Sequence, residues 1–264
     1  MIDFEQKPSY DVADLVEIVR ILRAPGGCPW DREQDHHSIR RDLLEEAYEV
    51  AEAIDEESPE HLREELGDLL LQVVMHSRME EEAGRANLSD VADGICKKLI
   101  YRHPHVFGDV TVSGSGQVLE NWEELKKKEK HQKTASDSVD AVARSLPGLW
   151  RAEKIQKKAA KVGFDWDSVD GAMAKLREET DELQAAIRDG SNVEEELGDL
   201  LFAAVNVARF VKTDPEGAMT AACDKFARRF RAVEEAAQAQ GRELSSMTLP
   251  EMDALWDAVK QREA

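Results

Sequence analysis

Eight acidic residues fall into two sets of four whose spacing suits the binding of a divalent metal ion. The two sets are Glu46, Glu49, Glu65 and Asp68, and Glu179, Glu182, Glu196 and Asp199. Each set consists of two pairs, and the members of a pair are three residues apart, so they share one flank of a helix. Four carboxylates brought together repel one another unless a cation compensates their charge. Mg²⁺ prefers oxygen ligands and is the metal we expect, with Mn²⁺ as an alternative.

Each set requires two helices that fold back on one another at a short turn. The first turn is expected at Ser58-Pro59, a helix N-cap followed by proline at the first helical position. The second is expected at Gly190-Ser191, a helix stop followed by an N-cap with Glu194 three residues on. Positions 57 and 189 are the midpoints of the two sets. Antiparallel helices rise about 1.5 Å per residue from a turn, so the register predicts that the four carboxylates of a set lie at one height.

The two sets belong to a duplicated segment. The letters Glu-Glu-Leu-Gly-Asp-Leu-Leu occur at 64–70 and again at 195–201, and Trp30-Asp31 recurs as Trp166-Asp167. In the first copy the apolar stripe of an amphipathic helix follows at Leu66, Leu69, Leu70, Val73 and Val74. Several landmarks recur in one order at a similar offset, which indicates duplication of a whole domain.

Composition indicates an all-α protein and excludes several classes. Alanine, glutamate and leucine are among the commonest residues, so we expect two tandem four-helix-bundle-like domains at 1–132 and 145–264, joined by a polar linker at 133–144. The net charge of −20 disfavours binding to nucleic acid. No apolar run approaches the roughly 18 residues of a membrane span. Three widely spaced cysteines, with no secretion signal at the first residues, favour a cytoplasmic location.

Basic and aromatic residues recur behind each acidic set. They are Lys98, Arg102, Trp122 and Lys126 in the first copy, and Lys225, Arg229, Trp256 and Lys260 in the second. The lysine and arginine of each pair lie one helical turn apart, so they are candidates for binding phosphate oxygens, although such pairs are commonly surface charge. Each tryptophan could stack on a nucleobase or could belong to a helical core.

The paired motifs resemble those of the MazG family of nucleoside triphosphate pyrophosphohydrolases. The family's Glu-Glu-x-x-Glu and Glu-x-x-Asp motifs occur at 45–49 with 65–68, and at 178–182 with 196–199. The segments Gly-Cys-Pro-Trp-Asp at 27–31 and Arg-His-Pro-His-Val-Phe at 102–107 are also typical of its tandem members. The resemblance implies a homodimer that uses Mg²⁺ to cleave nucleoside triphosphates to monophosphate and pyrophosphate. It also implies that the second copy carries the activity.

A mechanism follows for the second copy. Metal held by the second acidic set would orient a water molecule, and Glu178 or Glu195 would take its proton. Lys225, Arg229 and Lys260 would neutralise the phosphates as the bond breaks. All seven histidines lie at or before His131, so histidine cannot act in this copy. The sequence leaves open whether water attacks the α- or the β-phosphorus.

The sequence departs from the family pattern at one position and from its own repeat at another, and two alternative functions stay open. The family pattern commonly has a lysine shortly before Glu-x-x-Asp, where this chain has Asn192. Met75 stands where the second copy has Asn206, which predicts that the two copies are unequal. The alternatives are another all-α pyrophosphatase, of the dUTP or phosphoribosyl-ATP type, and a non-enzymatic helical module that binds cations structurally.

Overall fold

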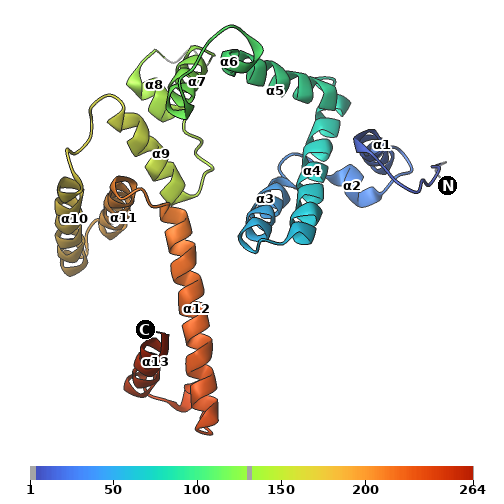
Figure 1. Cartoon of the computed structure of the whole chain (residues 1–264). Helices are drawn as coiled ribbons and strands as arrows, with labels where there is room; N and C mark the ends of the chain where they lie inside the picture. Colours follow the sequence, from blue (N-terminus) through green and yellow to red (C-terminus); the bar gives the residue numbers. More distant parts are fainter. Residues whose placement is uncertain (1–3, 130–132, 264) are drawn as a thin grey trace. The chain divides into compact units, whose positions relative to one another are not determined.

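The computed structural model describes residues 4–129 and 133–263, and within these ranges the chain folds into helices without any strand (Figure 1). The predicted all-α class is therefore confirmed. The chain divides into two compact units, with the boundary between residues 126 and 127. The end of the first domain expected at 132 lies outside the described residues. No helix in the described ranges is long and apolar enough to cross a membrane.

The first unit is built on a long central helix. Its helices are α1 (Val12–Arg23), α2 (Pro29–Glu33), α3 (Arg40–Asp55), α4 (Pro59–Glu82), α5 (Leu88–Arg102), α6 (Pro104–Phe107) and α7 (Ser115–Glu129). α1 and α3 both pack against α4. Ser58 caps α4 by accepting a hydrogen bond from the His61 amide at 3.3 Å, and Pro59 takes the first helical position, as predicted. This cap fixes where the α3–α4 hairpin turns.

The core of the first unit is small and leaves one side of α4 uncovered. Val19 of α1 and Val74, Met75 and Met79 of α4 form it together with Ile39. Only Val74 of the predicted apolar stripe is fully buried. Leu66, Leu70 and Val73 are 49%, 37% and 37% exposed. The amphipathic helix is thus present, but most of its apolar stripe has no cover within one chain.

The second unit repeats the hairpin. Its helices are α8 (Ala135–Asp140), α9 (Gly148–Ala160), α10 (Val169–Asp189), α11 (Val193–Phe210), α12 (Pro215–Ala239), the 3₁₀ turn η1 (Leu244–Ser246) and α13 (Leu249–Glu263). Gly190 ends α10 in the left-handed region, with φ +68°, as the sequence predicted. The predicted N-cap at Ser191 was wrong by one residue. Asn192 caps α11 with φ 51°, a conformation that asparagine tolerates, and its side chain makes no capping hydrogen bond.

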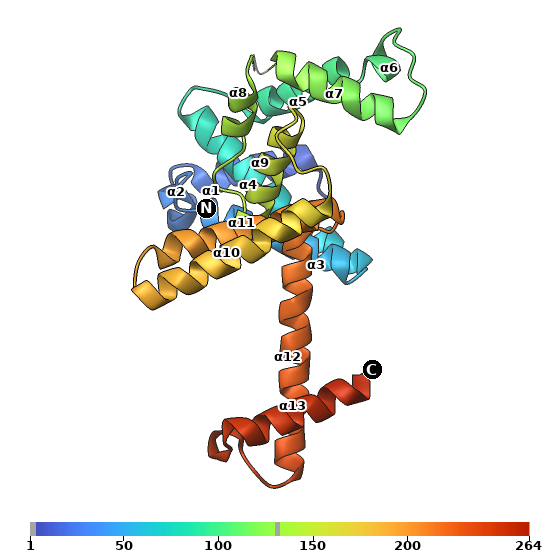
Figure 2. The same ribbon diagram turned by 90° about the vertical axis from the view of Figure 1, so that its left-hand side faces the viewer.

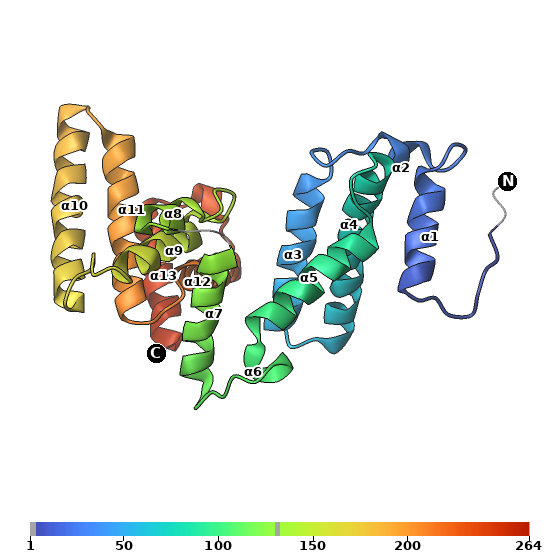
Figure 3. The same ribbon diagram turned by 90° about the horizontal axis from the view of Figure 1, so that it is seen from above.

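Two features of the second unit matter for the site. α10 and α11 run side by side (Figure 3), whereas α13 packs beside the far half of α12, away from that hairpin (Figure 2). The stretch 133–144, expected as a linker, contains α8, which packs against α9. Ser138 and Val142 are buried there.

Candidate metal centre

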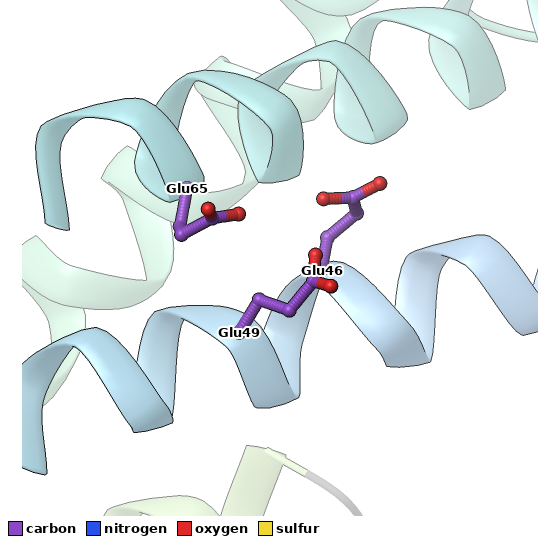
Figure 4. A group of neighbouring side chains, drawn as sticks. All are labelled: Glu46, Glu49 and Glu65. Atoms are coloured by element: carbon purple, nitrogen blue, oxygen red, sulfur yellow. The ribbon is translucent and has the colours of Figure 1, made fainter. Parts of the chain in front are cut away.

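The first acidic set assembles between α3 and α4. Glu46 and Glu49 of α3 and Glu65 of α4 have carboxylate oxygens within 4.8 Å of one another (Figure 4). Burial raises the pKa of Glu46, and the charges of Asp68, Glu49 and Glu65 raise it further. Asp68, the fourth member of the predicted set, lies near enough for its charge to act on Glu46, but it is not one of the three carboxylates within 4.8 Å of one another.

The second acidic set assembles in the same way between α10 and α11. Glu179, Glu196 and Asp199 have carboxylate oxygens within 4.8 Å of one another, and Glu179 is buried. Glu182, one turn after Glu179 on α10, is not one of these three. A hydrogen bond to Glu179 raises the pKa of Glu182, with further contributions from desolvation and from the charges of Glu179 and Glu196.

Both donor sets fit a hard divalent cation. Ligands on opposite sides of a Mg²⁺ ion, with metal–oxygen distances of about 2.1 Å, stand a little over 4 Å apart, and the carboxylate oxygens of each cluster meet that span. All the donors are oxygens, and histidine takes no part in the second cluster. Both helices of each hairpin supply carboxylates to its group of three, so closing the hairpin builds the site.

The cation beside each cluster differs between the copies. Lys175 of α10 lies with its Nζ 2.6 Å from Glu179 and 2.8 Å from Glu178, and both carboxylates raise its pKa. In the first copy, His61 of α4 places Nε2 3.1 Å from Glu65. Sequence reasoning missed Lys175, although its position four residues before Glu179 was a usable signal. The charge expected near Asn192 on one helix is thus supplied from the other helix of the hairpin.

Lys175→Met is expected to raise KM for a nucleoside triphosphate about tenfold, because a charged hydrogen-bond donor is lost where phosphates would lie. The same change should lower the Mg²⁺ concentration needed for half-maximal rate, since the cluster becomes more negative. Steady-state kinetics over a Mg²⁺ series measures both effects. Lys154→Met, which removes an exposed lysine of α9, is the control. An unchanged KM would contradict a role for Lys175 in substrate binding.

Glu46→Gln is expected to raise the melting temperature of the metal-free protein at pH 7 and to reduce the further rise caused by Mg²⁺. The pKa of Glu46 is raised above its ordinary 4.5 in the folded protein. The folded state therefore binds more protons than the unfolded state, and stability falls as pH rises through the folded pKa. Metal binding adds about 2.7 kcal/mol at a hundredfold excess over Kd.

Thermal melts at pH 5 and pH 7, with and without Mg²⁺, test the Glu46→Gln prediction. The gap between variant and wild type should be larger at pH 7 than at pH 5. A variant that melts at or below the wild-type temperature at pH 7 without metal would show that the first cluster is not under charge repulsion.

The predicted substrate-binding residues of the second copy lie apart from its acidic cluster. Arg229 pairs with Glu263 at 2.7 Å, and Lys260 lies 3.6 Å from Asp257. The Trp256 ring lies against Phe226, with centroids 5.2 Å apart, and Lys225 is exposed on α12. These residues belong to α12 and α13, and α12 extends away from α10 and α11 (Figure 1). One chain alone does not bring them to the carboxylates.

The matching residues of the first copy form a cluster of their own. The Arg102 guanidinium lies 5.2 Å from the centre of the Trp122 ring, and the Lys126 ammonium lies 4.8 Å from it. Arg102 is buried and Lys98 is half-buried one turn earlier on α5. Both cations lie within cation–π range of the Trp122 ring.

The two candidates for the catalytic base differ in their surroundings. Glu178 precedes the buried Glu179 and shares Lys175 with it. Glu195 is exposed in the first turn of α11, directly before Glu196. Either carboxylate adjoins the cluster without belonging to the group of oxygens that would hold the metal.

Comparison with known proteins identifies the family. The model of the MazG nucleotide pyrophosphohydrolase domain matches residues 34–107 and 168–233, which contain both acidic clusters. A nucleoside triphosphate pyrophosphohydrolase of Escherichia coli (strain K12) is 46% identical over 254 residues, covering 94% of this chain and 97% of the relative. A Thermotoga maritima protein named nucleoside triphosphate pyrophosphohydrolase/pyrophosphatase MazG is 42% identical over 247 residues, covering 94% of each chain. The uncharacterized protein YabN of Bacillus subtilis is 49% identical over 98% of this chain, which spans 54% of that protein. The chain therefore belongs to the MazG family of nucleotide pyrophosphohydrolases.

Proposed function

We propose that the second acidic cluster binds Mg²⁺ and that the chain there hydrolyses nucleoside triphosphates and deoxynucleoside triphosphates to monophosphate and pyrophosphate. The chain is an enzyme of this family, a nucleoside triphosphate pyrophosphohydrolase. The observation that carries the assignment of the site is the group formed by Glu179, Glu196 and Asp199, with a buried glutamate at its centre. Mn²⁺ is expected to replace Mg²⁺, because the donors are all oxygens.

The residues in and beside the second cluster would have different roles in this reaction. Glu179, Glu182, Glu196 and Asp199 would hold the metal. A metal held there would supply Lewis-acid polarisation of phosphate oxygens and activation of a water molecule. Glu178 or Glu195 would take the proton of the attacking water, and Lys175, which pairs with Glu179, would contact a phosphate oxygen of the bound nucleotide. Compensation of the phosphate charge lowers the barrier to breaking the bond.

A second copy of the chain would complete this site. On α11, Leu197 and Leu201 are 46% and 44% exposed, which leaves an apolar stripe uncovered just as on α4. An exposed apolar stripe of this kind marks an interaction surface. Lys225, Arg229, Trp256 and Lys260 are remote from the cluster of their own chain, so a homodimer in which α12 and α13 reach the partner's cluster satisfies both observations.

We propose domains at 1–132 and 145–264 around the segment 133–144, with the first copy serving assembly more than turnover. A role in clearing unwanted nucleotides from the cytoplasmic pool suits this activity, and the three cysteines are unpaired, as a reducing compartment allows. With a net charge of −20, we expect no nucleic-acid partner.

Product analysis over a panel of nucleotides tests the proposed function. ATP, GTP, CTP, UTP, the deoxynucleotides and phosphoribosyl-ATP are each incubated with the protein, with and without Mg²⁺. Pyrophosphate and monophosphate are expected in equal amounts from several of them, and only with the metal. Activity confined to dUTP or to phosphoribosyl-ATP would favour those alternatives. Release of orthophosphate, or no turnover at all, would contradict the proposal.

A further inference from the structure

The first turn of α12 is the place where this helix is held by the rest of the second unit. Pro215 is buried and Glu216 is half-buried, whereas every residue from 217 to 228 is exposed. α9 and α11 pack against α12, and because α12 runs away from both (Figure 1), they meet it near its start. Buried residues return at Val233 and Ala237, in the half of α12 that lies beside α13. The direction of α12 therefore depends on how its first turn is held.

The junction between α11 and α12 is not filled by packed side chains. Residues 211–213 form a tight turn in which Lys212 has φ 57° and the Thr213 amide donates to the Ala208 carbonyl oxygen at 2.9 Å. A cavity of about 560 Å³ lies at this junction, and Trp150 of α9 and Asp214 are in its wall. Close packing is what normally fixes the angle between two helices. Across a cavity of this size, packing alone does not fix the direction of α12.

A side-chain hydrogen bond joins α9 to the start of α12 across this junction. The Trp150 indole donates from Nε1 to Oδ1 of Asp214 at 2.7 Å. Trp150 lies in the first turn of α9, and Asp214 is the N-cap of α12. The bond is charge-assisted because its acceptor is a carboxylate, and such bonds are shorter and stronger than neutral ones. The indole has a single polar hydrogen, so this bond uses its whole donor capacity.

The Asp214 carboxylate is oriented by the helix that it caps. Its Oδ1 also accepts from the Glu216 amide at 3.2 Å, which is the N-cap bond of α12. A Cβ on Gly217 would stand 3.0 Å from Oδ2, closer than ordinary van der Waals contact. Glycine is unfavourable inside a helix, and here it leaves room for the carboxylate. Because the carboxylate is fixed to the first turn of α12, its bond to Trp150 relates the direction of α12 to α9.

The length of α12 makes its direction important for the residues farther along it. Lys225 and Arg229 follow Asp214 by eleven and fifteen residues. At about 1.5 Å per residue, Arg229 stands about 22 Å along the axis, so a change of about 10° in direction moves it by about 4 Å. A hydrogen bond to a phosphate oxygen is lost over such a distance.

We propose that Trp150 and Asp214 are positioning residues of this enzyme, and that their hydrogen bond sets the direction of α12 so that Lys225 and Arg229 reach the triphosphate at the partner's acidic cluster. Neither positioning residue touches the substrate. This inference rests on the proposed function, because a site shared between two chains is what requires the far part of α12 to be placed accurately.

The first copy is built differently at the corresponding place. The offsets of 136 and 127 residues that relate the copies in these regions place Asp14 opposite Trp150 and Asn87 opposite Asp214. Asp14 forms an ion pair with Lys7, and Asn87 caps α5 within its own first turn. These two described residues are not hydrogen-bonded to each other. The tie between the two helices thus belongs to the second copy, to which we assign catalysis.

Trp150→Phe is expected to raise KM for ATP about five- to tenfold and to leave kcat within about twofold of wild type. Without the bond, α12 points correctly in a smaller fraction of molecules, and bound substrate selects that fraction. Asp214→Ser should have the same effect, because serine still caps the helix but is too short to reach the indole. KM does not depend on the fraction of the protein that is folded.

Two variants control for these changes. Asp214→Asn keeps a carbonyl oxygen in place of Oδ1, so it should stay within about twofold of the wild-type KM. Trp30→Phe, at an exposed tryptophan of the first unit, should leave KM unchanged. An Asp214→Asn protein that behaves like Asp214→Ser would overturn the proposal, since the bond would then not be what matters.

A distance measurement tests the direction of α12 without turnover. Spin labels are attached at Arg188→Cys on α10 and Gln238→Cys on α12, both exposed positions, after the three native cysteines are replaced by serine. Labelled chains are diluted with unlabelled chains, so that the distance within one chain is measured. Trp150→Phe and Asp214→Ser should shift or broaden this distance, and Asp214→Asn should keep it.

The two measurements separate the possible failures. An unchanged distance in Trp150→Phe and Asp214→Ser would overturn the proposal, and so would a shifted distance with an unchanged KM; pyrophosphate release by the wild type would stand in both cases. If no nucleoside triphosphate is cleaved, the proposed function fails, and the distances still decide whether this bond sets the direction of α12.

Discussion

Glu196→Gln is expected to lower kcat/KM for nucleoside triphosphates by about 10²–10³-fold or more, because it removes a metal ligand at the proposed catalytic cluster. Glutamine keeps the size of the side chain, so the hairpin of α10 and α11 should still close. Asp199→Asn should have an effect of the same order. Both residues belong to the group of oxygens within 4.8 Å of one another that also includes Glu179.

The first copy provides the matched comparison. Glu65→Gln changes the residue at the same place in the repeat, and Asp68→Asn does the same for the second acid. Each is expected to cost less than about tenfold, because it acts through folding or assembly. Glu235→Gln removes an exposed charge of α12 and controls for the loss of one carboxylate. Equal losses in the two copies, at matched folded fraction, would show that the main site was assigned to the wrong half.

A heterodimer of two inactive variants is expected to recover about half of the wild-type activity. One chain carries Glu196→Gln and the other carries Arg229→Ala, and each variant alone should be nearly inactive. If α12 and α13 complete the partner's cluster, one of the two sites in the mixed dimer combines intact carboxylates with an intact Arg229. The other site carries both defects.

Coexpression with two different affinity tags isolates this mixed dimer for assay. The control is a mixed dimer in which both chains carry Glu196→Gln, which should stay inactive. No recovery in the mixed dimer would mean that the cluster and Arg229 of a single chain work together, or that Arg229 plays no part. A monomeric protein in solution would contradict the shared site directly.

The hairpins were the most predictable part of the fold because local signals determine them. The repeated spacing of the acidic residues, together with the cap at Ser58, predicted the meeting of Glu46, Glu49 and Glu65, whereas Asp68 stays outside that group. Helical periodicity and turn residues are properties of short segments, and both clusters follow from them. The one-residue error at Asn192 arose because asparagine can adopt the left-handed conformation at the turn.

Other features depend on contacts that sequence spacing does not reveal. The apolar stripe through Leu66 and Leu70 predicted burial, yet these side chains are exposed in one chain. Arg229 and Trp256 lie far from the cluster because the direction of α12 depends on tertiary packing. A cavity lined by Gln156 joins α9, α11 and the loop before α10. No sequence motif predicts that the Oε1 of Gln156 is buried there.

The most direct test of the central claim is to follow metal occupancy and turnover in the same titration. Mn²⁺ binding, measured by electron paramagnetic resonance, is compared with the rate of pyrophosphate release in wild type, Glu65→Gln and Glu196→Gln. We predict that Glu196→Gln removes the binding site whose occupancy tracks turnover, and that Glu65→Gln leaves that site and most of the rate in place. If Glu65→Gln loses both a Mn²⁺ site and its turnover while Glu196→Gln keeps its rate, the assignment of catalysis to the second cluster is contradicted.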